Sequence, residues 1–256
     1  MHRSKLKMFG KLYMKDLHEV TAEILVVIIG IVLVTTGFML KSDVPAPVFI
    51  FPLLLLLGLA GFLPLIASFK LLSREWSQNT VYLIMSLPVS GVMILGAKMM
   101  VLLTQYIIGT GLIALSGYLL YTTNLYQYIT PNQPGLSILF NNPELVRNLL
   151  AFYLCGLIFL MFLCSTSFFS QVTGKLSSRF SGLITAITFI ITLVLSGKIL
   201  TAFKISSITD NSRAMQMMGS ADNFVNSLNF SSLSYLLLAI VIFILAVMIY
   251  DRKLEL

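Results

Sequence analysis

Residue types that could carry out catalysis are scarce in this sequence. The only histidines are His2 and His18, and neither belongs to a His-Glu-x-x-His pair that could bind zinc. No Gly-x-Ser-x-Gly turn offers a serine nucleophile. No Gly-rich loop ends in Gly-Lys-Ser or Gly-Lys-Thr, so the chain has no such loop to hold the phosphates of ATP. We therefore expect no catalytic, metal-binding or cofactor-binding residues, and the sequence argues against an enzyme.

A stripe of hydroxyl side chains lies within the fifth apolar stretch of the chain. Thr185, Thr188, Thr192 and Ser196 follow one another at spacings of three and four residues, so they share one face of a helix. Ser and Thr on membrane helices often hydrogen-bond to their own backbone or to a neighbouring helix. The stripe is therefore either a helix–helix contact or the mildly polar wall of a substrate pathway.

Charged residues inside the apolar stretches are few. For ion coupling the charged candidates are Glu23 and Lys98, and both lie near one end of a stretch. We interpret Glu19 and Glu23 as interfacial anchors or partners of a neighbouring Lys. Lys98 is expected to extend its ammonium group back to the membrane surface. Ion-coupled transport generally needs a carboxylate deep in the membrane, so the sequence gives it little support.

The polar segment between the second and third apolar stretches has the most distinctive pattern. Residues 72–80 read Leu-Ser-Arg-Glu-Trp-Ser-Gln-Asn-Thr, and Leu-Pro-Val-Ser follows at 87–90. We expect a short amphipathic helix here, held against the membrane by Trp76 and later apolar residues. Arg74, Glu75 and Gln78 would then face the aqueous side. Pro88 suits the first turn of the next helix, where its missing N–H costs nothing.

These residues belong to a chain that is too apolar for a soluble domain. Of its 256 residues, 57% are hydrophobic and 11% charged, and its mean hydropathy is +0.93, whereas soluble domains carry about 25% charged residues. A membrane-spanning helix needs about 20 apolar residues. Six stretches meet that requirement: 20–40, 48–72, 92–121, 149–169, 182–200 and 232–250. We predict an all-α polytopic membrane protein with six transmembrane helices in a single transmembrane domain, residues 1–256.

The distribution of basic residues predicts the orientation of these helices. With six spans both termini lie on one side of the membrane, and that side carries twelve of the 17 Lys and Arg residues. The other side carries Lys41, Arg147, Lys198, Lys204 and Arg213. Cytoplasmic segments are enriched in Lys and Arg, so both termini are predicted to be cytoplasmic. The net charge of +7 is thus an orientation signal rather than a sign of nucleic-acid binding.

Residues 1–19 have the pattern of an amphipathic helix. Leu6, Phe9, Leu12, Tyr13 and Leu17 recur at helical spacing, with four lysines at other positions. We predict an interfacial helix lying along the cytoplasmic surface, its lysines near anionic lipid headgroups. The alternative is a basic orientation signal without fixed structure.

The segment after the second span resembles the permease subunits of type-2 ABC exporters. In that family an acidic residue follows the second span, then a Gly-Thr, a Leu-rich run, a Leu-Pro-Val-Ser and a helix bearing a Lys. Glu75, Thr80, residues 87–90 and Lys98 match this order at suitable spacing. Asn79 stands where Gly is usual, and Gly91 where Arg is common. The six spans, cytoplasmic termini, N-terminal interfacial helix and long last outer loop extend the resemblance over the whole chain.

The resemblance implies a function and a set of partners. Arg74, Glu75, Trp76, Gln78, Thr80 and Pro88 would belong to a coupling helix that docks on a separate ATPase subunit. Two permeases, identical or sister chains, would work with two ATPases that hold ATP and Mg²⁺, with the second and fifth spans near the pathway. The cargo would be hydrophobic or amphipathic, such as a peptide, an antibiotic or a lipid-like molecule, and this efflux would cross a bacterial plasma membrane. The alternative function is a non-transporting immunity or sensor component that binds a peptide or a signalling partner.

Overall fold

The computed structural model describes residues 2–39, 46–78, 90–120, 143–176, 180–208 and 221–254. These ranges form six α-helices: α1 (His2–Met39), α2 (Ala46–Ser77), α4 (Gly91–Leu120), α7 (Pro143–Gly174), α8 (Ser181–Ile208) and α10 (Ala221–Leu254). Each contains a stretch long and apolar enough to cross a membrane. The described residues contain no strand. This confirms the predicted all-α, multi-pass membrane architecture with six spans.

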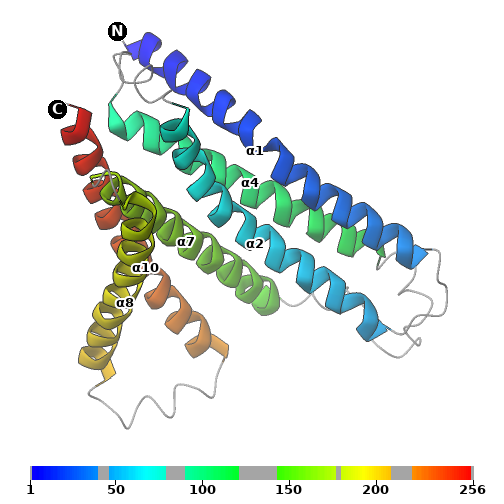
Figure 1. Ribbon diagram of the computed structural model, residues 1–256. Coiled ribbons are helices and arrows are strands. Elements are labelled where there is room, and N and C mark those ends of the chain that lie inside the picture. Colours follow the sequence, from blue (N-terminus) through cyan, green and yellow to red (C-terminus); the bar gives the residue numbers. More distant parts are fainter. Residues whose placement is uncertain are drawn as a thin grey trace.

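The helices form two groups of three (Figure 1). In the first group, α1 and α2 both pack against α4 and against each other. In the second group, α10 and α8 both pack against α7. Contacts of α7 with α2 and α4, and of α10 with α4, join the groups. Both ends of the chain lie at the same end of the molecule, together with the last turn of α2 and the first turn of α4 (Figure 1).

The largest apolar core lies near this end of the molecule. Leu71, Leu95, Phe168 and Tyr250 are among its fully buried members, and they come from α2, α4, α7 and α10. Elsewhere the helices turn large apolar side chains outward; Leu33, for example, is 69% exposed and Leu149 58%. Apolar side chains on this scale suit a hydrocarbon environment rather than water.

The N-terminal segment differs from its prediction. α1 is continuous from His2 to Met39, so no separate interfacial helix precedes the first span. Leu12, Tyr13 and Leu17 pack against the main apolar core, and the Tyr13 hydroxyl donates to Thr104 Oγ1 on α4 at 3.0 Å. The side chains of Leu12, Tyr13 and Leu17 therefore form a face of α1 that packs against other helices of the same chain.

The second helix also extends further than predicted. α2 runs without interruption past Pro52 and Pro64 to Ser77. Arg74, Glu75 and Trp76 therefore belong to its last turns, and the expectation that they lie on a separate short helix is wrong. The described structure resumes at Ser90, whose carbonyl accepts the backbone N–H groups of Met93 and Ile94 at the start of α4.

A buried charge cluster at the end of the second helix

Three charged side chains from three helices meet inside the protein, close to the end that holds the termini. Asp16 of α1, Glu75 of α2 and Lys98 of α4 are 2%, 3% and 1% exposed. The Lys98 ammonium donates to Glu75 Oε1 at 2.8 Å and to both oxygens of Asp16 at 3.3 Å. One cation therefore bridges two carboxylates that are far apart in the sequence.

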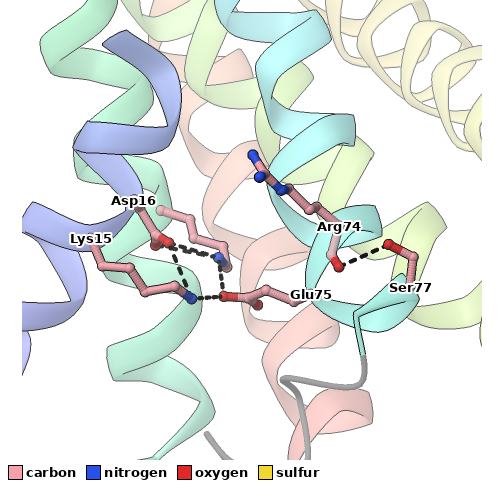
Figure 2. Close-up of polar contacts among 6 residues, drawn as sticks. Lys15, Asp16, Arg74, Glu75 and Ser77 are labelled. Carbon is pink, nitrogen blue, oxygen red and sulfur yellow. Dashed lines mark hydrogen bonds and ion pairs between the residues drawn. The ribbon is translucent and has the colours of Figure 1, made fainter.

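Lys15 completes the cluster from its rim. Its ammonium lies 2.9 Å from Glu75 Oε1 and 3.9 Å from Asp16 Oδ1, and its side chain is 40% exposed. Figure 2 shows Lys15 and Asp16 on one side of the cluster and Glu75 on the other, joined by these contacts. Two carboxylates thus face two ammonium groups. An uncompensated charge buried here would be costly, so the cluster depends on this balance.

Local sequence explains why these charges are buried. Along α4, Lys98 falls three residues after Leu95 and four before Leu102, both fully buried. Asp16 falls four residues before Val20 on α1, and Glu75 three and four residues after two buried leucines of α2. Residues three or four apart share a helix face. Each charge therefore occupies a core position of its helix, and this spacing is the signal that could have identified Asp16, which the sequence analysis did not consider.

Two expectations about these residues are wrong. Lys98 does not extend to the surface, because its ammonium pairs with Asp16 and Glu75. Glu75 does not face the aqueous side, because its carboxylate is enclosed by the same cluster. Glu23 and Lys98 are also not the only charged candidates, because Asp16 and Glu75 are buried. Glu23 itself pairs with Lys70 of α2, which agrees with its interpretation as the partner of a neighbouring Lys.

The other residues of the predicted coupling segment divide into exposed and half-buried positions. Arg74 and Gln78 are exposed, and the contact drawn for Arg74 in Figure 2 is the hydrogen bond that its carbonyl accepts from the Ser77 hydroxyl. Trp76 is half-buried, with the Lys175 ammonium 5.9 Å from its ring centroid, so the ends of α2 and α7 lie close together. Thr80 and Pro88 lie outside the described residues.

The start of α4 is held by the end of α10. The Gly91 backbone N–H donates to Asp251 Oδ1 at 2.8 Å, which places a carboxylate at a helix N-terminus. A Cβ on Gly91 would come within 2.9 Å of the Tyr250 ring, and Tyr250 is 1% exposed. This close approach accounts for glycine at position 91.

The hydroxyl stripe of α8 makes mainly local hydrogen bonds. The Thr185, Thr188 and Thr192 hydroxyls each donate to the carbonyl four residues earlier at 2.7–2.8 Å. Thr188 Oγ1 also lies 3.4 Å from Thr173 Oγ1 on α7. Ser196 is buried. These contacts favour the helix–helix interpretation for Thr188.

A denser polar contact, which the sequence analysis missed, joins α2 to α7. Ser68 Oγ and Ser167 Oγ are hydrogen-bonded at 2.8 Å. The Gln171 amide donates to the Ser68 carbonyl and to Ser167 Oγ, both at 3.1 Å. All three residues are buried. Cross-helix hydrogen bonds of this kind hold membrane helices together.

Two apolar grooves lie between the two groups of helices. One, of about 460 Å³, is bordered by α1, α4, α7 and α10 and is rich in methionine: Met93, Met99, Met100 and Met161. The other, of about 310 Å³, lies between α2, α4 and α7 beside Gly58, Gly61 and Gly156. Neither is lined by a residue of the charge cluster. Methionine side chains adapt to ligands of varied shape, so the larger groove suits an apolar molecule.

The chain matches no protein-family model, and no curated protein is significantly similar to it. Within the described residues, no group of three or more His, Cys, Asp or Glu side chains could hold a metal ion. We take the charge cluster and the exposed end of α2 as the candidate functional site, because of their burial, contacts and exposure.

Proposed function

We propose that this chain is the membrane-spanning permease subunit of an ATP-driven exporter of the type-2 ABC class. It would lie in a bacterial plasma membrane with both termini in the cytoplasm. ATP and Mg²⁺ would bind to a separate pair of ATPase subunits, and a second permease, either identical or a sister chain, would complete the transporter.

The observation that carries this proposal is that the polar end of α2 is bound to α1 and α4 by buried charge contacts. Arg74 is exposed in the last turn of α2, and exposed Gln78 directly follows that helix, its backbone N–H donating to the Arg74 carbonyl at 3.0 Å. Glu75, between them in sequence, is tied to α1 and α4 by the charge cluster. A push on Arg74 and Gln78 would thus reach three helices at once, as a coupling element requires.

The grooves support an apolar cargo. The Met-rich groove lies between the two groups of helices, so a change in their relative position would alter its width. Its lining residues lie within membrane-spanning segments, where an apolar ligand could enter from the lipid. Proteins that export peptides, antibiotics or lipid-like molecules need such a surface.

Co-purification tests the proposal directly. The tagged chain, extracted from its native membranes in mild detergent, should retain an ABC ATPase identifiable by mass spectrometry. ATP hydrolysis by that ATPase should rise when the permease is present. Replacing Arg74 and Gln78 by Ala should lower the amount of retained ATPase by about tenfold, since about 1.4 kcal/mol of lost contact changes affinity by that factor.

Arg74→Ala/Gln78→Ala is preferable to a Glu75 variant because Glu75 is part of the protein interior. The matched control is Lys198→Ala/Thr201→Ala, which removes an exposed cation and an exposed polar residue from α8. The control should retain the ATPase in full. Equal retention by both double variants would contradict docking at the end of α2.

Two other functions are separated by the same experiment. The buried carboxylates of Asp16 and Glu75 favour ion-coupled transport as a second candidate, because buried ionisable residues in membrane proteins often bind the coupling ion. An immunity or sensor component that binds a peptide or a signalling partner is the third. Permease-dependent stimulation of ATP hydrolysis would exclude both. A chain that purifies without any ATPase and transports its cargo only with an ion gradient would establish the second.

A further inference from the structure

The charge cluster links α1, α2 and α4 inside the protein, in addition to the Glu23–Lys70 ion pair between α1 and α2 and the Tyr13–Thr104 hydrogen bond between α1 and α4. α1, α2 and α4 each contribute one buried charged residue, and Lys98 contacts the other two. The hydrophobic attraction between apolar side chains has no preferred direction. Hydrogen-bonded charges fix both distance and direction.

Resting on the proposed function, we infer that Asp16 and Lys98 are positioning residues that hold the end of α2 against α1. They would present the exposed Arg74 and Gln78 and the lysine-bearing first half of α1 to the ATPase as one docking unit. Neither residue would itself touch the ATPase, since both are buried.

Within α2, Glu75 is the residue whose contacts fix the rotation of the helix about its axis. Adjacent helix residues are about 100° apart around the axis, so fixing the Glu75 carboxylate fixes the direction in which Arg74 points. Lys98 holds that carboxylate at 2.8 Å and Lys15 holds it at 2.9 Å. Because Lys15 and Asp16 are neighbours on α1, both contacts relate the rotation of α2 to that of α1.

The charge balance supplies a variant that separates positioning from stability. Lys98→Met alone leaves two carboxylates with Lys15 as the remaining cation of the cluster. Lys98→Met/Glu75→Gln leaves Asp16 beside Lys15, which lie 3.9 Å apart on the same helix. That double variant keeps a neutral cluster and should fold, but it no longer ties the Glu75 end of α2 to α1 by charge. The Glu23–Lys70 ion pair between the same two helices stays in place. Lys98→Arg keeps the cation and should preserve the tie.

Spin-label distances provide the first readout. Labels at exposed Met14 on α1 and at exposed Gln78, directly after α2, in a background where Cys155 and Cys164 are replaced by Ala, report the distance between α1 and the end of α2. The distance distribution should be narrow in the parent chain and in Lys98→Arg. It should broaden or shift in Lys98→Met/Glu75→Gln. An unchanged distribution in the folded double variant would overturn the inference.

Retention of the ATPase, measured without labels, provides the second readout. Lys98→Met/Glu75→Gln should retain about tenfold less ATPase than the parent, whereas Lys98→Arg should retain nearly as much. If the double variant has altered distances but retains the ATPase fully, the cluster does not act on docking and the inference fails. If the parent itself retains no ATPase, the proposed function fails, while the spin-label distances still decide whether the contacts of Lys98 position α2.

Discussion

Lys98 is the residue on which the balance of the cluster depends, because it contacts both buried carboxylates. Buried ion pairs contribute little net stability compared with apolar packing, but removing one partner leaves an uncompensated charge. Asp16 and Glu75 would face that situation without Lys98, since Lys15 is partly exposed. Replacing Lys98 alone and replacing it together with Glu75 should therefore change the free energy of unfolding by very different amounts.

Lys98→Met should lower the free energy of unfolding by about 3–5 kcal/mol, the usual cost of removing one partner of a buried ion pair. Lys98→Met/Glu75→Gln should recover much of this loss. The apparent melting temperature in detergent measures both effects. Lys11→Met, which removes an exposed lysine from α1, is the control and should stay within about 0.5 kcal/mol of the parent. A Lys98→Met variant as stable as this control would disprove the charge balance.

Two buried glutamines offer a second comparison at the residue scale. Gln171 donates to Ser68 and Ser167, whereas neither amide atom of Gln105 has a hydrogen-bond partner among the described residues. Gln171→Leu should therefore destabilise the protein by about 1 kcal/mol. Gln105→Leu should be neutral or stabilising, because it removes a desolvated amide. Thermal unfolding of the two variants side by side would reveal the difference, and the reverse order would refute it.

At the scale of elements, α4 is the centre of the first group of helices and also contacts the second. Its first residue, Gly91, is hydrogen-bonded to the end of α10, and its eighth, Lys98, is paired with α1 and α2. Within its first three turns α4 is thus connected by polar contacts to three other helices. By contrast, α8 packs mainly on α7 and turns apolar residues such as Leu183 and Ile190 outward.

Gly91→Ala should destabilise the protein, because its Cβ would approach Asp251 and the buried ring of Tyr250. We expect a loss of about 1–3 kcal/mol, the usual cost of overpacking. Gly96→Ala on the same helix is the control, since no atom lies within 4 Å of the added Cβ. That control should gain up to about 1 kcal/mol from the better helix propensity of Ala. If both substitutions change the melting temperature equally, the contact between α4 and α10 is unimportant.

At the scale of the whole molecule, more of the described basic side chains lie at the end that holds both termini than at the opposite end. The end that holds both termini carries Lys7, Lys11, Arg74, Lys175 and Arg252 among its described side chains, whereas Arg147 and Lys198 lie toward the opposite ends of α7 and α8. This asymmetry is the pattern of the positive-inside rule. It supports the cytoplasmic orientation of the termini that we propose.

Reporter fusions test that orientation. Green fluorescent protein at the C-terminus should fluoresce and alkaline phosphatase there should be inactive, because the former matures in the cytoplasm and the latter needs an oxidising compartment for its disulfides. Alkaline phosphatase inserted within residues 122–142 should be active. Active phosphatase at the C-terminus would require the opposite orientation for all six helices.

Composition and apolar run length determined the number and type of the elements. Six stretches of about 20 apolar residues can satisfy their backbone hydrogen bonds in lipid only as helices, so the helical class did not depend on packing. The apolar body of each span was also predictable, because it depends on residues close together in the sequence. The exposed positions of Arg74 and Gln78 agreed with prediction for the same reason.

The tertiary structure alone decided which charges are buried and with what partners. Lys98 and Asp16 are 82 residues apart, Lys98 and Glu75 are 23 apart, and Lys15 and Glu75 are 60 apart. A charged residue at a core position of one helix could equally extend to the surface, and only a facing helix with the opposite charge makes burial affordable. Three helices must meet to supply those partners. For that reason Glu75 and Lys98 were predictable as unusual residues, while their shared role was not.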